Sequence, residues 1–329
     1  MEEVYLLPIH SYFIVCSQAD ILTYFEVRRE LEQHFLNERL DFYHFGQLGF
    51  SFLRQDEKGI LKAPIADGRK RYLMVEGKKI TFSQILIIPN ITCSLRCKHC
   101  AAGNQFAERK VFDCKQTVDD FDKLLSACKT KQVNIQGGEV FLNPEISRFF
   151  ELLAQMENIK SCESVAVFTN ATVIPADEQL IAYNKIDLPK IFMISNYNRP
   201  NVKVAEFVAK IKSFNLDYCC FPPDEFWFHP SSPDKEIGYT EEELKEVINR
   251  CTKFTRAPKL IDGKFFACGQ NGYALYNKLR DFVDIRNCPL PDVEEQIYNH
   301  IFNMSNYDIC KYCRGEYANC ERIPVAEQL

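Results

Sequence analysis

Hydrophobic and polar positions become regularly spaced from Ser83 onward, where short apolar runs alternate with amphipathic stretches. The apolar runs predict five strands, at 84–89, 132–136, 164–170, 190–197 and 216–221. The amphipathic stretches between them predict four helices, near 115–129, 145–157, 176–184 and 201–213. Alternating strands and helices indicate parallel β/α units, which right-handed crossovers curl into a barrel or an open part of one. We therefore predict an α/β fold built on a partial (β/α) TIM-like barrel.

The pattern before this region differs. Ser11–Cys16 predicts a strand, Asp20–Glu38 an amphipathic helix and Leu40–Phe45 a second strand, which together would form a small βαβ-like unit. The first turn lacks the G-x-G-x-x-G of a dinucleotide site, so no nucleotide binding is assigned there. This N-terminal α/β segment has two open roles, either substrate recruitment or packing onto the main domain.

After the barrel pattern, a helix predicted at Thr240–Arg250 leads into Cys251. Leu260–Cys268 then predicts a hairpin with Asp262-Gly263 at its tip. We expect three domains: an N-terminal accessory segment at 1–82, the barrel at 83–238 and a cysteine-containing domain at 239–329.

Composition narrows the setting of the chain. Its 329 residues are 46% hydrophobic, which is enough for a substantial core, and its net charge of −5 without a long basic run argues against a nucleic-acid partner. No apolar run reaches 18 residues and the first residues lack a signal peptide's basic start, so we expect no membrane association and a cytoplasmic location. Fifteen cysteines in a reducing compartment favour metal binding over disulfides.

Three of these cysteines, Cys93, Cys97 and Cys100, follow the apolar run Ile85–Pro89 in a C-x3-C-x2-C pattern. Three closely spaced thiolates can hold three irons of a [4Fe-4S] cluster and leave the fourth iron open to a small molecule. Zinc is the alternative, but it requires four ligands and no second cysteine pair lies nearby. His99 is poorly placed to be that fourth ligand because it adjoins Cys100.

The spacing and context of this triplet resemble the radical S-adenosylmethionine (SAM) superfamily. The resemblance implies that SAM chelates the fourth iron through its amino and carboxylate groups. One departure is His99, which stands where the superfamily usually has a large aromatic residue and which we include among the expected cofactor contacts.

The ends of later strands extend the resemblance. A G-G-E stretch after the second strand resembles the family segment that binds the methionyl amino group, and polar residues after strands three and four resemble those that contact the SAM carboxylate and ribose. The polar residues after strands three and four have an alternative role, which is to cap the helix that follows. The expected SAM-binding residues are Gln136, Gly137, Gly138, Glu139, Thr169, Asn170, Ser195 and Asn196.

A second set of cysteines, Cys251, Cys268, Cys310 and Cys313, comprises two that flank the hairpin and a distant C-x2-C pair. Together with the G-x4-C at Gly263, the set resembles the auxiliary-cluster domains called SPASM and twitch. The resemblance implies one auxiliary [4Fe-4S] cluster, with structural zinc as the competing occupant. Two further cysteines remain possible substitutes, Cys288 and Cys320.

The family resemblance also implies the activity. A reduced cluster cleaves SAM to a 5′-deoxyadenosyl radical, which removes a hydrogen atom from the substrate, and the auxiliary cluster accepts an electron. The stretch from Trp227 to Gln328 resembles a branch that oxidises or epimerises sugars and aminocyclitols. Two alternatives stay open. The first is a maturase that modifies a ribosomal peptide; residues 1–80 of this chain would then recognise the leader of that peptide. The second is a non-catalytic iron–sulfur or zinc protein. The expected reductant is a flavodoxin or ferredoxin.

Candidate catalytic residues lie near the end of the fifth strand. Cys219 or Cys220 could return a hydrogen atom to the substrate, as an epimerase requires. Adjacent strand residues point to opposite faces, so at most one of the two cysteines faces the barrel interior. The alternative is that both are ordinary core residues. A dehydrogenase needs a base instead, and by their location the candidates for it are Arg199, Asp224, Glu225 and His229.

Overall fold

The computed structural model describes residues 4–9, 12–17, 50–54, 73–221, 226–228, 235–251, 255, 257–270, 272–303, 307–315 and 322–329. Several sequence predictions lie outside these residues: the helix at 20–38, the strand at 40–45, and the candidates Asp224, Glu225, His229 and Cys320.

A nine-stranded sheet forms the centre of the described fold, and five neighbouring strands in it are parallel. These strands are β5 (Lys79–Ile88), β6 (Lys129–Ile135), β7 (Ser164–Thr169), β8 (Lys190–Ser195) and β9 (Asp217–Phe221). They follow one another in chain order across the sheet, and the described sheet is open at β9. The predicted α/β fold with a partial barrel is therefore confirmed, and each predicted strand is present with its bounds shifted by a few residues.

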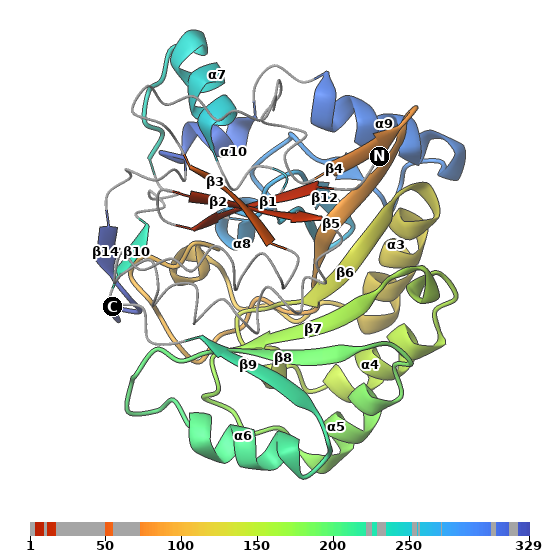
Figure 1. Ribbon diagram of the computed structural model, residues 1–329, viewed down its shortest axis with the longest axis vertical. Helices are drawn as coiled ribbons and strands as arrows, with labels where there is room; N and C mark the ends of the chain where they lie inside the picture. Colours follow the sequence, from red (N-terminus) through yellow and green to blue (C-terminus); the bar gives the residue numbers. More distant parts are fainter. Residues whose placement is uncertain are drawn as a thin grey trace.

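Four helices connect these strands and lie along the outer side of the sheet (Figure 1). They are α3 (Cys114–Ala127), α4 (Ile146–Gln155), α5 (Asp177–Asn184) and α6 (Val204–Lys212). α3 begins at Cys114 because the Asp113 carboxylate accepts a hydrogen bond from the Gln116 backbone N–H at 2.7 Å. Aromatic side chains fill the layer between helices and sheet, and Phe149, Tyr183 and Phe192 are fully buried there.

The hairpin predicted at 260–268 consists of β11 (Lys259–Ile261) and β12 (Lys264–Phe266). Its two turn residues, Asp262 and Gly263, have φ angles of 48° and 74°, as the Asp-Gly pair predicts. β11 also pairs in parallel with β5, so the hairpin extends the barrel sheet. β13 (Val283–Asp284) follows β12 at that edge.

The helices of this last third are α7 (Glu241–Arg250), α8 (Gly272–Leu275), α9 (Leu290–Phe302) and α10 (Asp308–Lys311). Thr240 and Glu243 form a capping box at the start of α7. A two-stranded ribbon joins β10 (Phe226–Phe228) to β14 (Arg322–Pro324). The domain bounds drawn from the sequence remain a proposal, since the first falls inside β5 and the hairpin of the third shares its sheet with the barrel.

The described strands before β4 form a separate antiparallel sheet in the order β1 (Val4–Ile9), β2 (Tyr12–Ser17), β3 (Phe50–Arg54). The predicted strand at 11–16 is β2, whereas β1 was not predicted because Pro8 interrupts its pattern. The predicted βαβ-like unit would pair β2 with the strand at 40–45, which lies outside the described residues, so that unit stays a prediction. β4 (Leu73–Glu76) pairs with β5 across a turn at Gly77.

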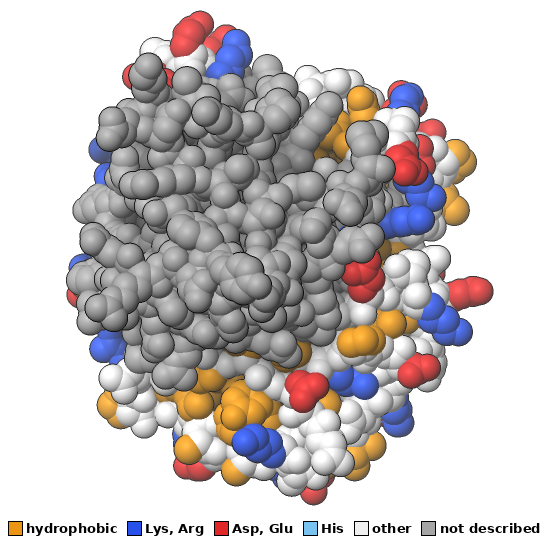
Figure 2. Space-filling model, viewed as in Figure 1, with side chains coloured by type: hydrophobic (Ala, Val, Ile, Leu, Met, Phe, Trp, Pro, Cys, Tyr) orange, Lys and Arg blue, Asp and Glu red, His pale blue; other side chains and the backbone are white. Residues whose placement is uncertain are grey.

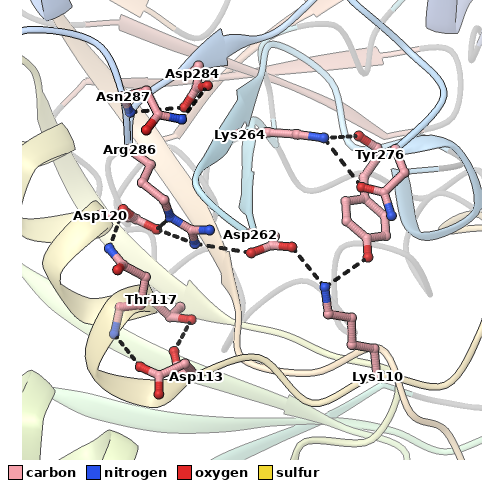
Figure 3. Close-up of polar contacts among 12 residues, drawn as sticks. Lys110, Asp113, Thr117, Asp120, Asp262, Lys264, Tyr276, Asp284, Arg286 and Asn287 are labelled. Carbon is pink, nitrogen blue, oxygen red and sulfur yellow. Dashed lines mark hydrogen bonds and ion pairs between the residues drawn. The ribbon is translucent and has the colours of Figure 1, made fainter.

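A polar network ties the hairpin turn to the helix layer (Figure 3). Arg286 bridges the buried Asp120 of α3, at 2.8 Å, and Asp262 of the turn, at 3.0 Å. Lys110 binds the other oxygen of Asp262 at 2.9 Å and contacts the Tyr276 hydroxyl at 3.4 Å. Although burial opposes the charged form, these two cations hold the pKa of Asp262 below its ordinary value. The network thus fixes the hairpin against α3.

Figure 2 shows one face of the molecule, on which the described acidic and basic side chains are interspersed along the margin. Among the described residues, no helix is long and apolar enough to cross a membrane.

Candidate functional site

The cysteine triplet lies on the loop that leaves the carboxyl end of β5, where sites of β/α barrels are found. Cys97 is buried, Cys93 and Cys100 are partly buried, and all three pack into one small apolar cluster with Leu95 and Ala326. The sequence predicted that these thiols share one site, and the structure brings them together.

The G-G-E loop after β6 is hydrogen-bonded along the cysteine loop. The Gly138 N–H donates to the Asn90 carbonyl at 3.2 Å and the Glu139 N–H to the Thr92 carbonyl at 2.8 Å. A Cβ atom at Gly138 would lie 2.3 Å from the Thr92 oxygen, and one at Gly137 would lie 2.7 Å from the Asn90 oxygen. Both glycines are therefore required for the close approach of two loops, whereas from the sequence we expected them to admit a ligand.

Asn90 is a site residue that the sequence analysis missed. Its fully buried side chain donates to the Glu139 carbonyl at 3.0 Å and to the Thr92 carbonyl at 3.1 Å, so it joins the two loops. The available signal was an amide placed directly after an apolar strand. Tyr273 of α8 was also missed; its hydroxyl donates to the Gly137 carbonyl at 2.8 Å. No local sequence pattern predicts that contact, because it joins residues 136 positions apart.

Glu139 and the end of β7 form the polar centre of the site. The Glu139 carboxylate is fully buried and accepts hydrogen bonds from the Thr169 hydroxyl and the Asn170 N–H, each at 2.9 Å. Burial raises the pKa of Glu139 to about 7, against the opposing effect of these hydrogen bonds. A cationic ligand would stabilise the carboxylate further, so this group suits an ammonium.

Asn170 contacts both this centre and the thiols. Its amide nitrogen lies 3.6 Å from the Cys93 sulfur and its side-chain oxygen accepts from the Thr172 N–H at 3.0 Å. At the end of β8, the Asn196 side chain accepts from the Asn198 N–H at 3.1 Å, which is a local turn contact. Ser195 hydrogen-bonds Tyr197. Gln136 and His99 are partly buried beside the loops.

The thiols themselves fit a metal cluster. Burial raises the pKa of Cys93 to about 12 and that of Cys97 to about 11, so both are protonated at neutral pH in the protein alone. Iron would compensate the buried thiolate charge and displace the protons. Three thiols facing one another, with amide donors beside two of them, form a donor set suited to three irons of a cluster.

The second predicted cysteine set also converges. Its four members, Cys251, Cys268, Cys310 and Cys313, line one small pocket with the apolar residues Val247, Ile248 and Ile309. Burial raises the pKa of Cys310 well above its ordinary value, and the three neighbouring thiols add to the effect. Thiolates are ligands both of iron–sulfur clusters and of structural zinc, so the residue types allow either occupant.

Cys288 does not line this pocket, because its thiol donates instead to the Pro289 carbonyl at 3.4 Å. In the part of the chain that the structure describes, no group of three or more histidine, cysteine or carboxylate side chains surrounds a single-ion position. Cys114, Cys128 and Cys162 are buried in the main core, as expected of small apolar residues.

The two faces of the parallel sheet separate the catalytic candidates. Cys219 packs with Ala166, Ile191 and Met193 on the face opposite the helices, whereas Cys220 packs against the helix-side core. Cys219 is therefore the one that faces the barrel interior. Arg199 lies closer to the triplet. Its guanidinium donates to the Val325 carbonyl at 2.8 Å, and its positive charge favours the thiolate form of Cys97 against the larger effect of burial.

Amide side chains line the same interior face on β5 and β6. Register places Gln84 beside Gln132, and Asn134 beside Ala166. Asn134 donates to Gln84 at 2.6 Å, while neither polar atom of the fully buried Gln132 has a hydrogen-bond partner within the described part of the chain. The Gln136 side-chain oxygen is likewise buried without a partner there. A stripe of neutral amides therefore leads toward the G-G-E loop.

Comparisons with known proteins found similar solved structures of low sequence identity. No family model matches the sequence and no curated protein matches it. BtrN in complex with AdoMet and 2-DOIA is 14% identical, with 73% of this chain and 98% of that chain covered and a TM-score of 0.46. For Streptococcus suis SuiB bound to S-adenosylmethionine, the identity is 11%, the coverage 97% and 95%, and the TM-score 0.39. Native anSMEcpe with bound AdoMet is 13% identical over 67% of this chain and 82% of that chain, with a TM-score of 0.34. These neighbours are radical SAM enzymes, the family that the cysteine triplet and the G-G-E stretch resemble.

Proposed function

We propose that this protein is a radical SAM enzyme that removes a hydrogen atom from a polar small molecule, oxidising or epimerising a sugar or aminocyclitol. One observation carries the proposal: the loop of the three cysteines and the G-G-E loop are hydrogen-bonded to each other at adjacent carboxyl ends of the sheet. Similarity in overall shape adds no weight at these TM-scores, so the proposal rests on the residues of the chain.

Different residues of the site have different roles in this proposal. Cys93, Cys97 and Cys100 would hold a [4Fe-4S] cluster, and buried Glu139 would bind the methionyl ammonium of SAM. Together cluster and SAM supply a 5′-deoxyadenosyl radical, which is the source of the chemistry. Thr169 and Asn170 orient the Glu139 carboxylate through three hydrogen bonds, so it meets the ammonium without rearrangement.

The amide stripe supports the substrate class. A buried amide without a partner costs about 1–3 kcal/mol, and among the described residues Gln132 and Gln136 both have atoms without one. Hydroxyl groups both donate and accept hydrogen bonds, so a polyhydroxylated ligand would satisfy these atoms without introducing charge. Cys219 lies on the same interior face and would return a hydrogen atom to the substrate, which supports epimerisation over dehydrogenation.

The four-cysteine pocket supports a second cluster. We assign Cys251, Cys268, Cys310 and Cys313 to one auxiliary [4Fe-4S] cluster of the twitch type. With all four thiols engaged, that cluster would exchange electrons without binding substrate. A flavodoxin or ferredoxin is the proposed reductant of the triplet cluster.

A second candidate function is maturation of a ribosomal peptide. The observation that favours it is the antiparallel sheet of β1, β2 and β3, which is separate from the barrel sheet and belongs to the segment 1–80 that would recognise the leader.

The deciding experiment uses anaerobically reconstituted full-length protein, reduced with dithionite and given SAM. Iron, sulfide and zinc are counted per chain and 5′-deoxyadenosine is assayed. We expect about eight irons and deoxyadenosine formation. About four irons with one zinc would keep the enzyme and remove the auxiliary cluster, whereas a fully loaded, reduced protein that neither binds nor cleaves SAM would refute the proposal. Adding polyols or candidate precursor peptides then separates the two substrate classes by which one stimulates deoxyadenosine formation.

A further inference from the structure

Residues 322–329 lie against the cysteine loop, although they are more than 220 positions away from it in the chain. β14 anchors the segment by pairing with β10, with Ile323 opposite Trp227. At the fully buried Ala326 the backbone turns with a φ of 50°, a left-handed conformation that non-glycine residues adopt only where packing enforces it. The turn directs the residues after it along the cysteine loop.

Two backbone hydrogen bonds hold the segment in register. The Lys98 N–H donates to the Glu327 carbonyl at 2.6 Å, and the Leu329 N–H donates to the Arg96 carbonyl at 2.9 Å. Between them, Gln328 lies directly opposite Cys97 in a β-bridge. The second residue of the triplet is thus the one that faces this segment.

The side chain of Gln328 makes three hydrogen bonds. Its oxygen accepts from the Arg96 N–H at 2.8 Å. Its nitrogen donates to the Ala326 carbonyl at 2.7 Å and to the Cys97 sulfur at 3.2 Å. Because the amide oxygen must face the Arg96 N–H and the amide nitrogen must face the Ala326 carbonyl, the orientation of the group is determined by its partners. An N–H donor is therefore directed at Cys97.

We propose that Gln328 is a positioning residue that donates an N–H···S hydrogen bond to the cluster-bound Cys97 thiolate and thereby raises the reduction potential of that cluster. The inference rests on the proposed function, since it concerns the cluster assigned to the triplet. On reduction, added negative charge spreads onto the sulfur ligands, so a donor to sulfur stabilises the reduced state more than the oxidised one. Reduction adds one electron to the cluster and leaves the hydrogen bond in place.

Gln328 is better placed for this role than the other polar groups nearby. The Asn170 amide lies farther from its sulfur, 3.6 Å from Cys93, and its oxygen is held by Thr172. Arg199 donates to the Val325 carbonyl and acts on Cys97 through its charge. Gln328 is neutral, so replacing it with a neutral side chain removes a donor without changing the charge near the cluster.

The test is an electron paramagnetic resonance redox titration of reconstituted full-length protein carrying Cys310→Ala together with Cys313→Ala. The second site then keeps two thiols, too few to hold a cluster, so the triplet cluster is the one observed. Gln328→Leu replaces the amide with an apolar side chain. At a fixed potential we expect the ratio of reduced to oxidised cluster to fall roughly three- to tenfold, equivalent to a potential about 30–60 mV lower for one electron. Leu329→Ala, which alters an exposed neighbour and keeps its backbone hydrogen bond, should leave the potential unchanged.

The outcomes separate the two proposals. If the protein with native Gln328 assembles no cluster, the proposed function fails. If Gln328→Leu holds full iron with an unchanged or higher potential, the role of Gln328 is refuted. If Gln328→Leu does not load iron, Gln328→Glu decides: it keeps the oxygen that accepts from Arg96 and places a second oxygen toward Cys97, so a potential equal to or above that of the native protein would refute the role.

Discussion

The two cysteine sites of this protein differ in how they are built. The triplet comes from eight consecutive residues on one loop, and polar groups from distant elements surround it: Asn170 at Cys93 and Gln328 at Cys97. The four-cysteine set spans 251–313, and the walls of its pocket between the thiols are mostly apolar. The cysteines of the first site are close together in the sequence, and polar side chains that could contact a ligand lie beside them. The cysteines of the second site come from separate segments that tertiary folding brings together. This contrast is what an open, reactive cluster and a closed, electron-carrying one would require.

The largest effect we expect comes from removing thiols until two remain at a site. Cys97→Ala should abolish deoxyadenosine formation and lower the iron content by about four per chain, because the remaining two thiols cannot hold the cluster. Cys310→Ala together with Cys313→Ala should also lower iron by about four but retain deoxyadenosine formation, since SAM binds at the other site. Iron analysis and chromatography of the product measure both.

The matched control for these variants is Cys162→Ala, which removes a buried thiol that belongs to neither site. It should keep the full iron content. Loss of deoxyadenosine formation in the Cys310→Ala, Cys313→Ala protein with the triplet cluster intact would show that the two sites are not independent and would contradict the comparison.

The next largest effect concerns the packing of the two loops at the triplet. Gly138→Ala would place a methyl group 2.3 Å from the Thr92 oxygen, and since the contact is with backbone the loops must separate. We expect a loss of more than about 2 kcal/mol in the free energy of unfolding, and weakened SAM binding. Gly272→Ala is the control, since its added methyl would meet only the flexible end of Ile261, at 3.2 Å. Urea unfolding compares them, and equal stabilities would contradict the loop-packing role.

A smaller effect is expected at Glu139. Glu139→Gln should weaken SAM binding roughly tenfold or more, because a neutral amide replaces the partner of the ammonium. Isothermal titration calorimetry with SAM on the reconstituted protein measures this. Binding unchanged by the substitution would remove Glu139 from the SAM site.

Glu139 also predicts a pH dependence. Its pKa is about 7 in the folded protein against 4.5 for an unperturbed glutamate, so between these pH values the folded state binds more protons than the unfolded state. The free energy of unfolding should therefore decrease as pH rises from about 4.5 to 7 and level off above. Urea unfolding without iron or SAM should show this slope, and Glu139→Gln should reduce it; an equal slope in both proteins would assign it elsewhere.

The smallest predicted effect lies in the network that fixes the hairpin near the second site. Asp120→Asn leaves Arg286 without its buried partner and should cost about 1–2 kcal/mol, reduced from the value for fully buried pairs because Arg286 is 34% exposed. Asp119→Asn on the same helix removes only the exposed pair with Lys115 and should cost less than about 0.5 kcal/mol. Thermal unfolding of both proteins is the measurement, and similar losses would contradict the structural importance of the network.

How far the sequence predicted this structure depends on whether the signal was local. The parallel strands, the outer helices and the Asp262-Gly263 turn follow from periodicity and turn chemistry, and all are present. The sharing of one sheet by the hairpin and the barrel was not predictable, since strand pairing depends on contacts across 170 residues.

The same distinction holds for the site. The triplet, Glu139 and Thr169 were found from motifs and strand ends, and they lie together. Tyr273, Gln328 and the interior position of Cys219 were not, because they reach the site through tertiary packing that leaves no local pattern. The close packing of Gly137 and Gly138 against the backbone of the cysteine loop was not predicted either, because it depends on how two loops approach each other.

The parallel pairing of β11 with β5 has a mechanical consequence. Ile261 lies in register with Ile88, so the strand that ends just before the triplet loop is hydrogen-bonded to the hairpin that leads to Cys268. Neighbouring strands are held about 4.8 Å apart by their backbone hydrogen bonds. The position of Cys268 relative to the triplet loop is therefore set by a sheet and not by a hinge. We expect that position to stay constant while substrate enters and leaves.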